Sequence, residues 1–173
     1  MSPEMKVVVS VLGIGLAMFA MHRLKTRRHI GDFALGKPKM GPSLLWLGIY
    51  VAWMLGTNYI WHWRGPWDFA PWKQASLLHD AERVLAVGIL GPIAEELFFR
   101  GILYRLILGT RLGVRGAILI SAAAWAPLHT QYTWGVVLFI FVDGLLLGLS
   151  RYFAKSVWVP AAMHIAWNLF AVW

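Results

Sequence analysis

The 173-residue sequence contains no cysteine and few charged residues. The lack of cysteine excludes disulfide bonds, thiolate metal sites and a cysteine nucleophile. Charged residues make up only 14% of the chain, with eight acids against sixteen lysines and arginines. Apolar residues are abundant instead, since 59% of the chain is hydrophobic and the mean hydropathy is +0.61. This composition is wrong for a soluble domain and typical of a polytopic membrane protein.

Six apolar runs follow one another along the chain and predict the fold. We expect an all-α polytopic membrane protein, a bundle of about six transmembrane helices with a central polar active-site cavity. Small residues over 121–124 predict a face on which another helix can approach closely, and Gly144 and Gly148 indicate a second surface for helix packing. The expected spans are residues 7–21, 42–63, 84–108, 116–129, 134–149 and 157–173.

The distribution of basic residues predicts the orientation. With six spans and the N-terminus outside, the inner loops hold eleven lysines and arginines and the outer segments hold four. A single lysine, Lys6, precedes the first apolar run and a basic cluster follows it, so we expect a retained helix, with a cleaved signal peptide as the alternative. The basic segment 22–39 then faces anionic lipid, and no nucleic-acid partner is expected. Compact loops favour a multi-pass protein of a prokaryotic plasma (inner) membrane.

Three ionisable residues, Glu95, Glu96 and Arg100, interrupt the third apolar run. A charged side chain at the middle of a membrane helix costs at least ~2.5 kcal/mol, so such residues are functional by default. On a helix Glu96 and Arg100 lie at i and i+4 on one face and can pair, whereas Glu95 points about 100° away. The spacing predicts a paired carboxylate that supports the site and a free carboxylate, Glu95, that can act as a general base.

Three later spans also carry polar side chains. The fourth has Trp125 and His129 at i and i+4, the fifth has the lone acid Asp143, and the sixth has His164 and Asn168 at i and i+4. The last pair can form hydrogen bonds that hold two helices together, or can supply two donors aimed at one point, as an oxyanion site needs. Asp143 needs a partner that the sequence does not name.

Taken together, these residues favour the activation of water, because no serine or cysteine is set up as a nucleophile. In this interpretation Glu95 and His129 hold and deprotonate a water molecule. His164 and Asn168 donate hydrogen bonds to the oxygen of a tetrahedral intermediate. The expected chemistry is amide hydrolysis. A purely structural polar cluster, or an ion path, is the alternative for the charged residues of the third span.

At these residues the sequence resembles the CPBP intramembrane proteases, a family that includes CAAX prenyl-protein endopeptidases and bacteriocin-processing or immunity-type proteins. The three family motifs occur in order, as Glu95-Glu96-x-x-x-Arg100, Trp125-x-x-x-His129 and His164-x-x-x-Asn168. The second motif has Trp where the family has Phe. The resemblance covers residues 84–173 and implies a catalytic core there, within a single membrane domain (1–173) that begins with N-terminal helices and loops (1–83).

The resemblance implies a glutamic-type intramembrane endopeptidase that uses no metal and no other cofactor. Two departures from the family pattern matter, because Trp125 is bulkier than Phe and Asp143 belongs to none of the three motifs. The implied catalytic residues are Glu95 and His129 for water activation and His164 and Asn168 for the oxyanion hole, with Glu96 and Arg100 in support and Trp125 and Asp143 as accessory residues.

Two other classes of protein stay open. A zinc-dependent membrane hydrolase could use Glu95, Glu96, His129 and His164, although no His-Glu-x-x-His helix is present. A non-enzymatic immunity or partner-binding protein, or a proton-coupled carrier, could use the same polar residues. The expected partners are the lipid bilayer and a membrane-associated protein or peptide substrate, with or without a lipid attached.

Overall fold

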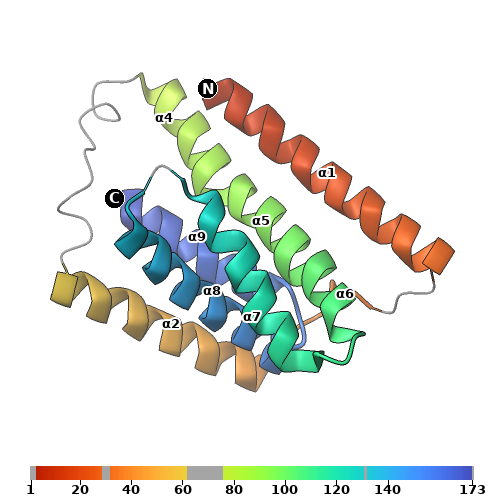
Figure 1. Cartoon of the computed structure of the whole chain (residues 1–173). Helices are drawn as coiled ribbons and strands as arrows, with labels where there is room; N and C mark the ends of the chain where they lie inside the picture. Colours follow the sequence, from red (N-terminus) through yellow and green to blue (C-terminus); the bar gives the residue numbers. More distant parts are fainter. Residues whose placement is uncertain (1–2, 29–31, 62–75, 131, 173) are drawn as a thin grey trace.

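The computed structural model describes residues 3–28, 32–61, 76–130 and 132–172. Every regular element within these residues is helical, so the predicted all-α class is confirmed. Both ends of the chain lie at the same end of the bundle (Figure 1). The helical segments are α1 (Pro3–Arg28), α2 (Met40–Trp61), a long composite helix over 77–108, α7 (Gly113–Trp125), α8 (Trp134–Ala154) and α9 (Trp158–Val172).

Three of the described helices are long and apolar enough to cross a membrane, namely Glu4–Arg27, Met40–Trp61 and Trp134–Ala154. Their outer surfaces are apolar too. On α1, for example, Leu12 is 65% exposed and Leu16 is 68% exposed. Such an apolar surface is unfavourable in water and suits contact with lipid tails. The chain is therefore a multi-pass membrane protein.

The composite helix contains two π-helical stretches, which separate three α-helical ones. Its parts are α4 (Leu77–Arg83), the π-helical η1 (Val84–Leu90), α5 (Gly91–Glu96), the π-helical η2 (Leu97–Leu103) and α6 (Tyr104–Leu108). The side chain of Ser76 caps the start of α4 by accepting a hydrogen bond from the His79 N–H. Pro92, which has no N–H to donate, lies in the first turn of α5. The two acids of the third span thus lie between two π-helical turns, a feature that is frequent at functional sites.

The packing of α7 against α8 depends on small residues, as predicted. A Cβ atom added at Gly144 would lie 3.0 Å from the Ala122 Cβ, and one at Gly148 would lie 3.1 Å from the Ile118 side chain. A side chain at either position of α8 would therefore push α7 away by a few tenths of an ångström. The same part of α8 also contacts η2, since Arg100 Nη2 donates to the Gly144 carbonyl at 3.2 Å.

The segment before α2 is tied to the turn between α8 and α9. Lys39 N donates to Ala154 O at 2.9 Å, and Val157 N donates to Ala34 O at the same distance. The Ser156 hydroxyl adds a third bond, to Gly36 O. These bonds fix the end of the bundle that is opposite to the two chain termini (Figure 1).

An apolar cluster fills the interior beside the polar residues of the third and sixth spans. It joins α2, η2, α7, α8 and α9 through buried side chains. Trp125 belongs to this cluster and is only 3% exposed. The candidate site therefore lies against this closely packed apolar cluster. The buried members are Tyr50, Phe99, Trp125, Leu147, Ala154, Val159 and Met163.

Candidate active site

Glu96 and Arg100 form the buried pair that the spacing predicts. Arg100 Nη1 lies 2.6 Å from Glu96 Oε1, and both side chains are fully buried. A buried carboxylate and guanidinium that compensate each other in this way are costly to separate, because removal of one leaves the other charged and without a counterion. The predicted separation of the two acids is also present, since Glu95 leaves this pair and lines a cavity.

Trp125 donates the indole N–H to the Glu95 carboxylate. The distance from Nε1 to Oε2 is 2.5 Å, and the bond joins residues on α7 and α5 that are 30 positions apart. A phenylalanine at this position has no such donor. Besides its greater bulk, the tryptophan of the second motif therefore adds a charge-assisted hydrogen bond to the candidate base.

The Trp125 ring also contacts three other polar residues of the site. Its centroid lies 5.1 Å from that of His129 and 5.1 Å from that of His164, in edge-to-face geometry both times. Arg100 Cζ lies 4.6 Å from the ring centroid, on the scale of a cation–π contact. Trp125 thus holds together side chains from all three motifs.

His164 and Asn168 reach the site from α9. His164 Nδ1 lies 3.1 Å from Glu96 Oε1, so the carboxylate that pairs with Arg100 also orients this imidazole. Asn168 Nδ2 donates to the Val87 carbonyl in η1 at 2.9 Å. An asparagine amide carries two N–H groups, and one of them is used in this bond. Both side chains line the same cavity as Glu95.

His129 lies just past the end of its helix, which differs from the expected helical span over 116–129. The α-helix ends at Trp125 and a 3-10 turn, Ala126–Leu128, follows. Pro127 lies inside this turn, where its ring and missing N–H disfavour a further α-helical turn. The His129 ring still contacts Trp125 and stacks on Tyr132 at 6.3 Å, and its Nδ1 is buried with no hydrogen-bond partner among the described residues.

Asp143 finds its partner on α2. The Tyr50 hydroxyl donates to Asp143 Oδ2 at 2.8 Å, and both residues are buried. The sequence shows that Asp143 needs a partner, but its spacing does not identify Tyr50 as that partner. The available signal is a tyrosine hydroxyl at the middle of an apolar helix, because a buried hydroxyl needs a polar partner.

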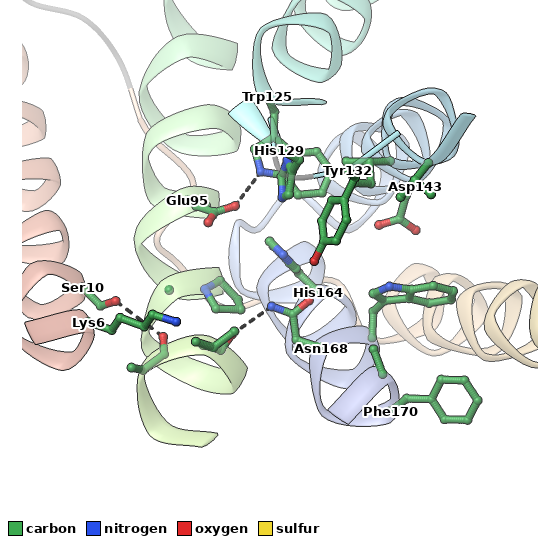
Figure 2. Close-up of a pocket in the computed structure, with 18 of the residues that line it drawn as sticks. Lys6, Ser10, Glu95, Trp125, His129, Tyr132, Asp143, His164, Asn168 and Phe170 are labelled. Atoms are coloured by element: carbon green, nitrogen blue, oxygen red, sulfur yellow. Dashed lines mark hydrogen bonds between the residues drawn. The ribbon is translucent and has the colours of Figure 1, made fainter. Parts of the chain in front are cut away.

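One cavity of about 320 Å³ collects the candidate side chains (Figure 2). The four predicted catalytic residues line it, and so do the two accessory residues. Glu96 and Arg100 do not line it and lie behind His164 and Trp125, in supporting positions. The polar lining comes from Lys6, Ser10, Glu95, Trp125, His129, Tyr132, Asp143, His164 and Asn168.

The zinc alternative has little geometric support. Among the described residues, a group of at least three potential metal ligands with their atoms within 4.8 Å of one another is formed by Glu4, His79 and Glu82. This group lies on α1 and α4, outside the cavity. The glutamates and histidines of the cavity do not form such a group.

Comparisons with known proteins give one finding. No curated protein and no solved structure matches the chain. A family model does match, over residues 78–170, which is more than half of the chain and spans all three motifs. Its description is type II CAAX prenyl endopeptidase, Rce1-like. Because this match covers more than half of the chain, the chain belongs to the Rce1-like family of type II CAAX prenyl endopeptidases.

Proposed function

We propose that the chain is an endopeptidase that cleaves a membrane-associated protein or peptide with water activated by Glu95 and His129. The family points to a protease. The observation that carries the finer proposal is the presence of Glu95, His129, His164 and Asn168 around one cavity. A base, a second proton carrier and two hydrogen-bond donors are the groups that hydrolysis of an amide requires.

In the proposed reaction, water lies between Glu95 and His129. Glu95 takes a proton from the water while the water oxygen bonds to the carbonyl carbon of the substrate. The electron pair of the carbonyl double bond moves onto the carbonyl oxygen. His164 and Asn168 donate hydrogen bonds to this negative oxygen. When the carbon–nitrogen bond breaks, the proton passes to the leaving amine. The elements of water are thus divided between the new carboxylate and the new amine.

The supporting residues set the orientation of these groups. Trp125 directs one oxygen of Glu95 and leaves the other to face the cavity. His164 Nδ1 faces Glu96 Oε1 at 3.1 Å, which leaves Nε2 as the nitrogen that can donate to an oxyanion. Glu96 thus orients His164, and Arg100 in turn holds Glu96 in place.

The experiment that tests the proposal compares purified wild-type protein with Glu95→Gln in liposomes. Membrane-associated peptides are added, and new peptide ends are identified by mass spectrometry. Glu82→Gln, a matched change on α4 outside the cavity, is the control. We expect new ends with wild type and Glu82→Gln and none with Glu95→Gln. Loss of activity after chelation would instead support the zinc hydrolase, and no cleavage by wild type would support a non-enzymatic role.

Substrate and location extend the same proposal. We place the protein in a prokaryotic plasma membrane, with a substrate presented at or within the bilayer. Parallel assays of prenylated and unmodified forms of each cleaved peptide show whether an attached lipid contributes to recognition. A rate that is unaffected by the lipid would remove lipidation from the description of the substrate.

A further inference from the structure

A second cavity, of about 400 Å³, lies at the opposite end of the bundle from the chain termini. It is lined by residues of α6, the start of α7, the end of α8 and the segment before α2, and it is open to the surface. Three basic side chains and one acidic side chain line it. The lining residues that carry the argument are Asp32, Tyr104, Arg105, Arg151, Tyr152 and Lys155.

Within the part of the chain that the structure describes, none of the three cations of this cavity forms a salt bridge, and Asp32 is the one acid that lines the cavity with them. The ion pairs of the described residues involve Glu4 and Glu96 instead. Asp32 uses Oδ1 to accept a hydrogen bond from Ala34 N at 2.8 Å. Like charges held around one cavity repel each other, and an anion inside it relieves this repulsion.

Two buried side chains show that the cavity is more than a basic patch at helix ends. Arg151 is only 5% exposed, and its guanidinium is fixed by donation from Nε to Arg100 O at 3.2 Å and by the Tyr104 ring at 5.2 Å. Tyr104 is 1% exposed, and its hydroxyl has no hydrogen-bond partner among the described residues. A buried guanidinium and a buried hydroxyl that share a cavity need an acceptor there.

The dipoles of the helix C-termini explain only part of this arrangement. They favour lysine and arginine near the last turns of α6 and α8, which accounts for exposed residues such as Lys155. They do not account for a guanidinium withdrawn from water beside a tyrosine hydroxyl. A tetrahedral anion with several acceptor oxygens matches arginine forks, an ammonium and a hydroxyl at once.

We propose that this cavity is a phosphate-binding site that takes the phosphodiester of an anionic lipid or a free phosphate. Its position agrees with this ligand, because the distribution of basic residues places this end of the bundle at the cytoplasmic face. Basic pockets between membrane helices at that face bind anionic headgroups. Through Arg151 the site also touches the backbone of Arg100, the residue that pairs with Glu96.

The test uses the full-length protein in neutral detergent, with thermal unfolding followed by tryptophan fluorescence. The ligands are phosphatidylglycerol, phosphatidylcholine and inorganic phosphate, the last against chloride at equal ionic strength. The pocket variant is Arg105→Gln/Lys155→Gln. The control, Arg111→Gln/Arg115→Gln, removes the same charge from exposed residues of the same end that do not line the cavity. Lys155→Gln, at an exposed position, serves alone if the pocket variant does not fold.

We expect phosphatidylglycerol to raise the unfolding temperature of wild type and of the control more than phosphatidylcholine does. In the pocket variant, the lipid concentration at half effect rises about tenfold or more. If inorganic phosphate alone gives the shift, the ligand is the free ion, and if only phosphatidylglycerol does, it is the lipid. Equal weakening of the two double variants, or no shift in wild type with either ligand, would overturn the proposal.

Discussion

The replacement Trp125→Phe isolates the hydrogen bond between the indole and Glu95. It keeps an aromatic ring between the two histidines and restores the residue of the family motif, while it removes the 2.5 Å bond to Oε2. Hydrogen bonds to a charged group contribute about 1.5–3 kcal/mol. If this free energy serves to orient the base, its loss lowers kcat by about tenfold to a hundredfold.

The assay compares kcat and KM for a cleaved peptide in liposomes. Trp125 acts through Glu95, so we expect kcat to fall and KM to stay nearly constant. Trp158→Phe is the matched control, because it also removes an indole N–H bond, the one to Leu35 O at 2.8 Å, away from the cavity. Wild-type kcat in Trp125→Phe would refute the argument and would mean that the family's phenylalanine serves equally well in this site.

Three further predictions concern the oxyanion site, the buried pair beside α2 and the packing of α8. Asn168→Ala should lower kcat about 10²–10³-fold in the peptide assay, as loss of an oxyanion donor does, and a loss below fivefold would contradict that role. Tyr50→Phe should destabilise the fold by about 1–2 kcal/mol in thermal unfolding, because Asp143 loses its donor, and an unchanged unfolding temperature would show that the bond contributes nothing. Gly144→Val should cost about 1–3 kcal/mol or more by forcing α8 away from Ala122, whereas Gly41→Val, which meets no atom within 4 Å, should cost far less, and equal effects would contradict the packing argument.

Local spacing predicted the parts of the site that lie on one helix. The i, i+4 relation identified the Glu96–Arg100 pair and separated Glu95 from it. Small residues four apart on α8 predicted a face for helix packing, and the structure shows that α7 lies against it. Such contacts depend on helix geometry alone, so a sequence with clear apolar runs defines them.

Contacts between distant helices were beyond the same reasoning. The Tyr50–Asp143 bond joins residues 93 positions apart, and the His164–Glu96 contact joins residues 68 apart. The π-helical turns around α5 and the early end of α7 were not predicted either. Each depends on how helices rotate and pack against one another, and apolar periodicity does not specify that rotation. The assignment of roles from the family motifs stays a prediction.

The initial rate of peptide cleavage by Glu95→Gln, relative to wild type, tests the central claim most directly. The amide keeps the shape of the side chain but cannot accept the proton of water, and general-base catalysis contributes about 10²–10⁴-fold. We therefore predict a rate at least about a hundredfold lower at an unchanged unfolding temperature. A rate within about threefold of wild type would show that the Glu95 carboxylate is not the base.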